Sequence, residues 1–568
     1  MKEADLRQAI SEAKLNNPKI QDVVEASKRK YEFKVQGRGS IWKLLLVFPY
    51  TFPYRLPAVQ LLNKDKIGEI PHVNRSGVIC VEESDSILLD YARAGEIIDS
   101  FVTDTIKLLD RASLKLYKDE LFNELEGYFN FKDKVKSFYS AGDNTEYLTL
   151  RIRQVKSRKI FEQIPIVMLG RDNSLPNDFS NLSKSSKTTS QKIIHLALEN
   201  PVLPPRNQGD ITPSYFDELK GNLSRDDLGK FKKLAKAFKK GRSFFILVSM
   251  PREYGERTQY LLRFSSKTPL SYPVEVTDSN WGITSYAIIR HNKEYLLERG
   301  GAETNLNDKK VCVIGCGSVG GEIASMLAKS GVGELVLVDD DSFEADNIYR
   351  HRLGGSSLDF QNSTSTDDAI MPKKVSALAS SLQSDTPYLK IKQKPVKFDE
   401  ITGSTDLLNS DVVIVAVGSP STNLYINHKL KQLNVKKVVF CWNEASGYGG
   451  HSVAIDLDKS CLECLYTDDN GFSMGNRLSL VKAGQNISKN LTGCAGVFTP
   501  FSYLDSSQTA AAASKQCVNL LLGDNHPQAI SWKGEDRYGL KVTDRFNTMP
   551  LKEEIGLECS KTCRVCNG

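Results

Sequence analysis

Hydrophobic and polar positions over the first 120 residues predict a small α+β domain. The opening stretch MKEADLRQAISEAK has the spacing of a polar helix, and YEFKVQG and WKLLLVFPY are typical of strands. A proline-rich turn leads into the strand AVQLL, and GEIIDSFVTDTIKLLDRASLKLY then places apolar residues at helical spacing. We therefore expect the first domain to cover residues 1–120.

The pattern changes twice further along the chain. Residues 121–290 contain the strand-like runs FFILVSM and QYLLRFSS, the polar stretch NSLPNDFSNLSKSSKTTSQK and the basic amphipathic stretch DDLGKFKKLAKAFKKG. These predict an α/β linking domain, a loop or connector, and a helix whose basic face either binds a partner or is simply solvated. From residue 291 to 568, KKVCVIGCGSVGGEIASMLAKSGVGELVLVDDDSF indicates the strand, turn, helix and strand that open a doubly wound, Rossmann-like domain.

Composition narrows the class of protein. A chain of 568 residues is long enough for about three or four domains, and the net charge of +6 from 75 basic and 69 acidic residues does not favour a nucleic-acid partner. No apolar run approaches the ~20 residues of a membrane span, and the N-terminus does not read as a secretory signal, so we expect a cytoplasmic protein. Its 11 cysteines then suggest thiols, metal ligands or nucleophiles, and the first 311 residues contain a single one, Cys80.

A glycine loop lies between the first strand and helix of the third domain. Gly315, Gly317 and Gly320 have the G-x-G-x-x-G spacing that lets a phosphate approach the backbone and a helix N-terminus. Asp339 ends the next strand, where a carboxylate can hold a ribose hydroxyl. These residues alone suit a dinucleotide-binding dehydrogenase equally well.

A polar series after that strand favours another chemistry. Asp341, Asn347 and Arg350 follow closely, and Lys374 opens the helix PKKVSALASSL. An amide and two cations beside a nucleotide phosphate site suit neutralisation of a triphosphate while a carboxylate attacks it. The simpler reading is a set of surface charges after a strand.

This order of residues resembles the ThiF/MoeB/ubiquitin-activating superfamily, whose members adenylate the C-terminal carboxylate of a ubiquitin-like or related protein. The resemblance covers residues 311–380 and implies ATP as substrate, with Asp339 on the ribose and Asn347, Arg350 and Lys374 on the phosphates. It also implies a homodimer.

Two further positions are compared with the family pattern: one departs from it, and one matches it approximately. Gly418 stands where the family has an Asp for magnesium, which leaves Asp341 as a substitute Mg²⁺ ligand and Asn423 as a residue lining the same pocket. Arg290 lies about where the family places an arginine that reaches the ATP of the neighbouring subunit.

Two C-x-x-C pairs predict a tetrahedral structural zinc site. They are Cys461 with Cys464 and Cys563 with Cys566, and Cys559 is a spare candidate nearby. The superfamily commonly has paired zinc knuckles in this arrangement. A redox role for either pair is the alternative.

Between the pairs, Cys494 lies in a Gly/Thr-rich segment before a helix of small residues. This segment resembles the family's crossover region, which implies that Cys494 captures the activated carboxylate as a thioester. Cys517 lies among apolar helical residues and is expected to be buried. Strand or turn packing is expected for Cys312, Cys316 and Cys441.

Cys80 ends the stretch IPHVNRSGVIC, where a proline and a glycine favour a loop that presents the thiol, although free cysteines are often simply buried. Residues 20–115 resemble ubiquitin-conjugating enzymes in their Trp, their proline-rich turn and this final Asn, Gly and Ile-Cys. The resemblance implies that Cys80 accepts the acyl group. His72 stands where that family has an oxyanion-stabilising Asn, so it is expected to donate a hydrogen bond or to act as a base.

A conjugating domain before an activating domain resembles the bacterial fusion enzymes of antiphage CBASS operons and related conjugation systems. The resemblance implies adenylation of a partner ending in glycine, transfer to Cys494 and then to Cys80, and conjugation to a target, with lysine favoured over a hydroxyl. The partner would be a cyclic-nucleotide synthase (CD-NTase) or a ubiquitin-like protein. A sulfur-carrier adenylyltransferase, a non-enzymatic scaffold and a nicotinamide oxidoreductase are the rival readings.

Overall fold

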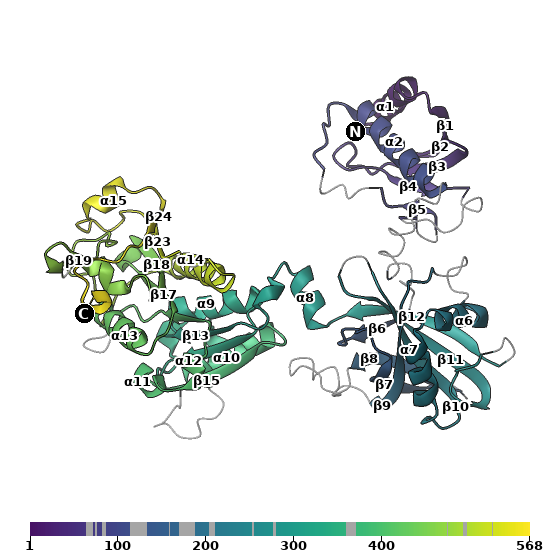
Figure 1. Ribbon diagram of the computed structural model, residues 1–568. Helices are drawn as coiled ribbons and strands as arrows, with labels where there is room; N and C mark the ends of the chain where they lie inside the picture. The colour runs from purple at the N-terminus through teal and green to yellow at the C-terminus, as the bar shows by residue number, and fades with distance from the viewer. Residues whose placement is uncertain are drawn as a thin grey trace. The chain divides into compact units, whose positions relative to one another are not determined.

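The computed structural model describes residues 1–63, 72–73, 76–81, 87–113, 126, 133–157, 160–169, 188–203, 211–252, 255–276, 280–358, 371–473, 475–491, 497–524 and 526–567. The chain divides into two compact units, the first holding the described residues up to Asn292 and the second those from Lys293 onward (Figure 1). The expected multidomain class, α+β followed by a Rossmann-like α/β domain, is confirmed.

The first unit begins with a five-stranded antiparallel sheet in the order β1-β2-β3-β4-β5. Helices α1 and α2 pack against each other and share one hydrophobic core with the sheet, so the helices and strands expected here are confirmed. The elements are α1 (Glu3–Asn16), β1 (Ile20–Ser27), β2 (Lys30–Gln36), β3 (Ile41–Val47), β4 (Ala58–Leu61), β5 (Val78–Ile79) and α2 (Ala94–Ser113).

The linking region folds as a closed barrel in the order β10-β11-β12-β6-β8-β7-β9, a more specific arrangement than the expected α/β domain. One apolar core lies among the strands, and a second joins the barrel wall to helices α6 and α7. The elements are β6 (Lys134–Ser137), β7 (Glu146–Ser157), β8 (Ile160–Leu169), β9 (Thr188–Ala197), α6 (Pro213–Gly221), α7 (Arg225–Ala235), β10 (Gly241–Met250), β11 (Thr258–Leu270) and β12 (Gly282–Arg290).

The second unit is built on an eight-stranded sheet in the order β15-β14-β13-β16-β17-β18-β23-β24. Neighbours from β15 to β17 pair in parallel, and the remaining pairs are antiparallel. The strands are β13 (Lys310–Ile314), β14 (Glu334–Val338), β15 (Lys390–Lys394), β16 (Val412–Val415), β17 (Lys437–Asn443), β18 (Gly449–Asp456), β23 (Gln528–Lys533) and β24 (Lys552–Gly556).

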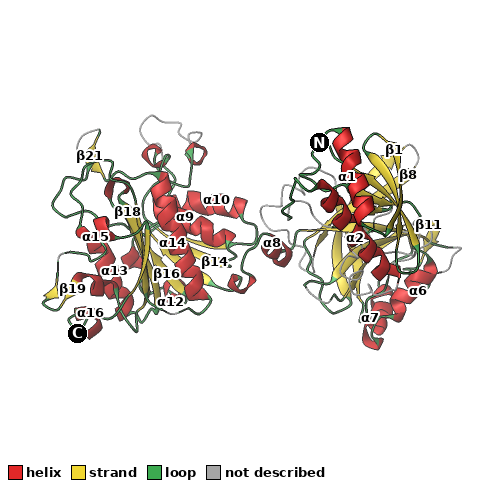
Figure 2. Ribbon diagram, turned by 90° about the horizontal axis from the view of Figure 1, so that it is seen from above, coloured by secondary structure: helices red, strands yellow, loops and turns green. Residues whose placement is uncertain are grey.

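Helices cover both faces of this sheet (Figure 2). One core contains residues of α9 (Ser318–Lys329), α10 (Lys374–Asp385) and α14 (Tyr503–Leu521). The other contains residues of α11 (Phe398–Ile401), α12 (Thr405–Leu408) and α13 (Pro420–Gln432). Parallel strands covered on both sides are apolar throughout, as VCVI, LVLV and VVIV are, and ligands of such sheets bind at the carboxyl ends of the strands.

Shorter elements complete the second unit. They are α8 (Lys293–Arg299), the 3₁₀ helices η4 (Thr304–Leu306), η5 (Ala345–Asn347), η6 (Gly355–Ser357), η7 (Ala445–Gly447) and η8 (Leu462–Tyr466), the strands β19 (Thr467–Asp468), β20 (Gly471–Phe472), β21 (Lys489–Asn490) and β22 (Val497–Phe498), and the helices α15 (Asp544–Thr548) and α16 (Arg564–Asn567). Among the described residues, no helix combines the length and the apolar character that a bilayer span requires.

Candidate functional site

The glycine loop connects the carboxyl end of β13 to the N-terminus of α9. Gly315 has a φ of +86°, and a Cβ there would lie 2.8 Å from the carbonyl oxygen of Ala416 on the neighbouring strand connection. A Cβ on Gly320 would lie 1.8 Å from the carbonyl oxygen of Gly315, so the helix start packs directly on the loop. A Cβ on Gly317, the N-cap of α9, would meet no described atom within 4 Å. The loop is therefore tightly packed on its inner side and open where the helix N-terminus attracts anions.

Asp339 lies beside this loop because β13 and β14 are parallel neighbours that end at the same edge of the sheet. One of its carboxylate oxygens accepts a hydrogen bond from the backbone N–H of Cys316 at 2.7 Å, and the other accepts one from Asp341 at 2.9 Å. The sequence-predicted pairing of Asp339 with the glycine loop is thus present in space. Its contact with a ribose stays a prediction.

Lys374 reaches the same edge from the start of α10. Its ammonium group forms an ion pair with Asp341 at 2.8 Å, and its backbone N–H donates to the carbonyl oxygen of Asp341 at 3.0 Å. Together with Asp340, whose carbonyl oxygen accepts a hydrogen bond from Lys373, the carboxylates of Asp339 and Asp341 form a group whose ligand atoms lie within 4.8 Å of one another. Such oxygens are the ligands that Mg²⁺ prefers, so this donor set fits the expected ion chemically.

Arg350 and Asn347 follow on a short helical turn. The side-chain oxygen of Asn347 accepts a hydrogen bond from the backbone N–H of Glu344 at 3.1 Å. The Arg350 guanidinium lies 5.8 Å from the centre of the Phe501 ring, a cation–π distance. Phe501 comes shortly after β22, so the chain that follows Cys494 returns to one of the predicted phosphate-binding residues.

Cys494 itself lies outside the described residues. The strands that flank it, β21 and β22, pair antiparallel with Lys489 opposite Phe498. Beyond them, the hydroxyl group of Tyr503 at the start of α14 donates a hydrogen bond to Glu322 on α9, the helix that the glycine loop begins. These contacts tie both sides of the Cys494 segment to the second unit, and its role as a nucleophile stays a prediction.

His351 is a buried residue of this site that sequence reasoning missed. Its Nδ1 accepts a hydrogen bond from the backbone N–H of Leu353 at 3.0 Å, so the proton lies on Nε2, which donates to the carbonyl oxygen of Cys316 at 2.8 Å. Burial lowers the pKa of His351, which keeps the ring in this neutral form. The imidazole therefore holds the loop carbonyl in place. Its position directly after Arg350 was the only signal in the sequence.

Gly418 and Asn423 lie near the carboxyl end of β16, as the sequence suggested. Gly418 has a φ of +73°, which a glycine adopts more readily than the expected Asp, and a Cβ there would meet no described atom within 4 Å. Asn423 is 3% exposed, and its side-chain oxygen has no hydrogen-bond partner among the described residues. An unsatisfied buried amide beside an open helix N-terminus fits a site that binds a polar ligand.

Arg290 is not brought to the glycine loop by any described contact. It ends strand β12 of the barrel in the first unit, where its guanidinium forms ion pairs with Glu126 and Glu256 and donates to the carbonyl oxygen of Arg257 at 2.5 Å. These contacts favour a structural role at the end of the barrel, and the predicted reach to an ATP of a neighbouring subunit stays untested.

The four cysteines of the two C-x-x-C pairs come together. Their sulfur atoms lie 3.5 Å apart for Cys461 and Cys563, 3.7 Å for Cys464 and Cys566, and 3.9 Å for Cys461 and Cys464. A zinc ion with bonds of about 2.3 Å would set sulfur atoms roughly 3.8 Å apart at the corners of a tetrahedron. Hydrogen bonds from Cys461 and Cys566 lower the pKa of the Cys464 thiol. The cluster fits structural zinc, and Cys559 lies exposed outside it.

Four further described cysteines of the second unit are buried, as expected. Cys312, Cys316, Cys441 and Cys517 are at most 1% exposed. Burial raises the pKa of Cys312 and of Cys441 to about 12, and it raises the pKa values of Cys316 and Cys517 as well. Because the thiolate is the nucleophile, these residues are packing groups.

Cys80 is exposed, which answers the question its sequence left open in favour of a presented thiol. It directly follows β5, which pairs with β4 through Val59 and Ile79. The backbone N–H of Cys80 donates to the carbonyl oxygen of His72 at 2.7 Å, and His72 has a φ of +65°. The structure therefore brings these two predicted residues together through the backbone. The catalytic role of His72 stays a prediction.

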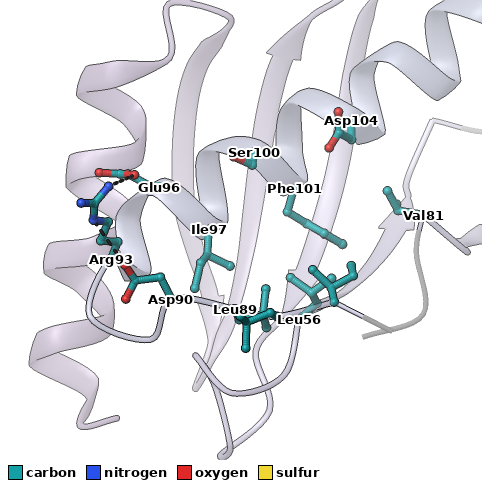
Figure 3. A pocket seen from close by; sticks show the side chains of 12 residues that line it. Leu56, Val81, Leu89, Asp90, Arg93, Glu96, Ile97, Ser100, Phe101 and Asp104 are labelled. Atoms are coloured by element: carbon teal, nitrogen blue, oxygen red, sulfur yellow. Dashed lines mark hydrogen bonds and ion pairs between the residues drawn. The ribbon is translucent and has the colours of Figure 1, made fainter. Parts of the chain in front are cut away.

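A pocket of about 270 Å³ opens beside this segment (Figure 3). Val81, the residue after Cys80, lines it together with apolar side chains such as Leu56, Leu89 and Phe101. At its rim, Arg93 forms ion pairs with Asp90 and Glu96. The exposed thiol thus lies one residue from a pocket lined by both apolar and charged side chains.

The chain thus carries two features: a nucleotide-type edge with acidic and basic side chains in the second unit, and an exposed cysteine on an α+β fold in the first. Residues 295–515 match the ThiF family, and residues 8–138 match prokaryotic E2 family B. The chain therefore joins an E2-like segment to a ThiF-type segment.

In this combination it resembles the bacterial proteins called ATP-dependent ubiquitin transferase-like protein Cap2. The chain is 26% identical over 245 residues to Cap2 of Vibrio cholerae, a match covering 41% of this chain and 39% of that protein. It is 26% identical over 298 residues to Cap2 of Pseudomonas aeruginosa, covering 50% of each. The chain spans half or less of the length of these curated relatives.

Solved structures offer a weaker likeness. The crystal structure of Escherichia coli MccB with ATP is 17% identical, with a TM-score of 0.32, over 46% of this chain and 67% of that one. A TM-score this low supports no argument about function.

Proposed function

We propose that this chain activates the C-terminal carboxylate of a partner protein with ATP and conjugates that partner to a target through a relay of two thioesters. One observation carries the proposal: an edge of a ThiF-type sheet holding the glycine loop, Lys374 and Arg350 occurs in one chain with an exposed Cys80 in an E2-like segment. Neither a dehydrogenase nor a sulfur-carrier adenylyltransferase would need the second feature.

In the first step, a carboxylate oxygen of the partner attacks the α-phosphorus of ATP, and pyrophosphate leaves. The open N-terminus of α9 at Gly317 would hold phosphate oxygens, and Lys374 and Arg350 would neutralise the charge that develops. Lys374 would exchange its present ion pair with Asp341 for the phosphates. Asp339 would hold a ribose hydroxyl, and Asp341, released from Lys374, would be a ligand for Mg²⁺, which would add positive charge beside the same phosphates.

In the second step, the Cys494 thiolate attacks the acyl-adenylate, forming a thioester and releasing AMP. The Cys80 thiolate then attacks that thioester and frees Cys494. Finally an amine, most simply that of a lysine, attacks the Cys80 thioester, and the thiolate leaves while the amine gives up a proton. His72, whose carbonyl oxygen binds the Cys80 backbone, would donate to the oxyanion or accept this proton.

We infer that the partner is a ubiquitin-like protein or a CD-NTase ending in glycine, and that the enzyme works as a homodimer. The resemblance to Cap2 supports a ubiquitin-like class of transfer.

The test is a non-reducing gel with ATP, magnesium and either candidate partner, run with wild type, Cys80→Ala, Cys494→Ala and the buried-site control Cys517→Ala. We expect a thiol-sensitive adduct that persists on Cys494 without Cys80 and disappears without Cys494. Carboxylate-dependent exchange of pyrophosphate into ATP is measured in parallel. Exchange without any thioester on Cys80 would favour an adenylyltransferase without conjugation, and no exchange with either partner would overturn the proposal.

A further inference from the structure

Helix α7, the turn after it and the start of strand β10 carry a dense group of cations. The group consists of six exposed side chains, Lys232, Lys233, Lys236, Lys239, Lys240 and Arg242, and is called the basic face below. These six cations lie within residues 232–242, a stretch that contains no acidic residue. Positive charge is therefore dense along this short part of the chain.

Packing orients these cations outward. Phe231 and Ala235 of α7 are buried against the barrel, and the hydroxyl group of Tyr147 on β7 donates to the carbonyl oxygen of Leu234 at 2.7 Å. The ammonium group of Lys192 on β9 lies 4.1 Å from the centre of the Tyr147 ring. Since Lys192 is exposed, a second element adds positive charge where α7 rests on the barrel.

The outer surface of β7 also carries positively charged side chains. Leu148, Leu150 and Ile152 point into the barrel core, so Arg151 and Arg153 alternate to the outside. Thr149, which precedes them on that outer face, lies opposite Lys192 in the pairing of β7 with β9. Cations from α7, β7 and β9 thus border one region of the barrel wall.

The basic face is not neutralised within the described part of the chain. The ion pair that α7 forms there joins Lys230 to Asp227 at 3.2 Å, near the helix start, and none of the six side chains of the basic face has a carboxylate within 4.0 Å among described residues. Like charges so close together repel one another, which costs stability unless a ligand of opposite charge compensates. The chemistry of the face therefore calls for a polyanion.

The kind of cation indicates which polyanion. Five of the six side chains are lysines, which act as hydrated point charges, whereas the bidentate recognition of phosphates favours arginine. No large hydrophobic side chain of α7 or of the turn after it is exposed, so neither presents an exposed ring on which a nucleic-acid base could stack. Lysine charges spread over a surface attract the acidic surface of another protein and speed the association of the two.

We propose that the basic face docks an acidic surface of the protein that this chain activates. This assignment rests on the proposed function, and it gives the barrel, which holds neither of the predicted thiols of the relay, the task of recruiting the partner. Docking through the basic face would raise the local concentration of the partner's C-terminus without contributing to the chemistry.

The experiment uses the full chain and two labelled probes, a 20-residue polyglutamate peptide and a 20-nucleotide single-stranded DNA, titrated by fluorescence anisotropy at 50 and 200 mM NaCl. The variant carries Lys232→Glu, Lys236→Glu and Lys239→Glu. The matched control carries Lys19→Glu, Lys329→Glu and Lys482→Glu, which are exposed lysines outside α7 and give the same change in net charge. Pyrophosphate exchange with a free peptide ending in glycine is assayed on all three proteins.

We expect the variant to bind polyglutamate at least tenfold more weakly than wild type at 50 mM NaCl, and the control to remain within about threefold. Exchange with the short peptide should be unchanged, because the peptide lacks the acidic surface that the basic face is proposed to dock. Tighter binding of DNA than of polyglutamate, with loss in the variant, would overturn the proposal in favour of a nucleic acid. The proposal would also be overturned if the variant and the control lost equal affinity for polyglutamate, or if wild type did not bind it. Either result would mean that the basic face is only solvated. If exchange fails in all three proteins while the binding difference persists, the proposed function falls and the polyanion site stands.

Discussion

The glycine loop and the Cys80 segment both follow a strand, yet they are built in opposite ways. The glycine loop follows a strand in the interior of an eight-stranded sheet and is held by Asp339, by His351 and by the close approach of Ala416. Cys80 follows the two-residue strand β5 at the edge of its sheet and is exposed. A site for a small charged ligand gains from fixed dipoles, whereas a thiol that must meet another protein has to lie at an accessible edge.

The largest effect we expect comes from removing two of the proposed zinc ligands, which should destabilise the second unit and leave the fold around Cys80 in the first unit unchanged. Cys461→Ser combined with Cys563→Ser should abolish zinc binding and destabilise the second unit by several kcal/mol, since structural zinc contributes on the order of 10 kcal/mol. Hydrogen exchange should rise around η8 and α16 and stay unchanged in β4. Metal analysis should find about one zinc per chain in wild type and in the exposed control Cys559→Ser. A double variant that keeps its zinc would contradict the assignment.

The second largest effect tests whether the residues beside the glycine loop, at the carboxyl edge of the sheet, catalyse adenylation. Lys374→Ala should slow pyrophosphate exchange by ~10²-fold or more, because it removes a charge placed for the transition state. Lys373→Ala is the matched control, since its ammonium group already donates to the carbonyl oxygen of Asp340 at 2.6 Å. The idea fails if both substitutions slow exchange equally while the melting temperatures stay the same.

Alkylation measures the difference in accessibility directly. Native protein treated with iodoacetamide should be modified at Cys80 at least ~100-fold faster than at Cys316, since Cys316 is fully buried and its pKa is raised by burial. Peptide mass spectrometry over time gives both rates, with Cys559 as an exposed reference. Comparable rates for Cys80 and Cys316 would remove the basis of the comparison.

Two alanine substitutions sharpen the picture of the glycine loop itself. Gly320→Ala should lower the free energy of unfolding by roughly 1–3 kcal/mol, because its Cβ has no room against the Gly315 carbonyl. Gly317→Ala has room in the free protein and should leave stability unchanged, while ATP binds ~10-fold more weakly because the methyl group lies where phosphate approaches. Urea unfolding and nucleotide titration separate the two. Unchanged ATP affinity in Gly317→Ala would place the phosphates elsewhere.

The smallest expected effect concerns pH at the fixed loop. Burial lowers the folded-state pKa of His351, so on acidification the unfolded chain binds a proton before the folded chain does. Stability from this residue is therefore present above the unfolded value near 6.5 and falls below it, by at most about 1.4 kcal/mol per pH unit. Wild type should lose more unfolding free energy than His351→Gln between pH 7 and 5.5. A parallel loss in both proteins would contradict this.

Local patterns were sufficient for the helices and strands with clear periodicity and for the position of the glycine turn. The apolar runs VCVI, LVLV and VVIV predicted buried parallel strands, and the helical spacing around α1, α2 and α7 matched the helices observed. The spacing of the glycines and the two C-x-x-C pairs indicated a nucleotide loop and a metal cluster. Such signals are visible in one dimension because a strand, a turn or a chelate requires particular neighbours in the chain.

The sequence by itself thus determined the order of the E2-like and ThiF-type segments, the position of the glycine turn and which cysteines pair as C-x-x-C. Tertiary structure alone decided that Cys80 is exposed while Cys316 is buried, that Arg290 pairs with Glu126 and Glu256, and that the linking region closes into a barrel. It also decided that His351 fixes the glycine loop. Burial and the pairing of charges depend on segments far apart in sequence, and their energies arise only when folding brings those segments into contact.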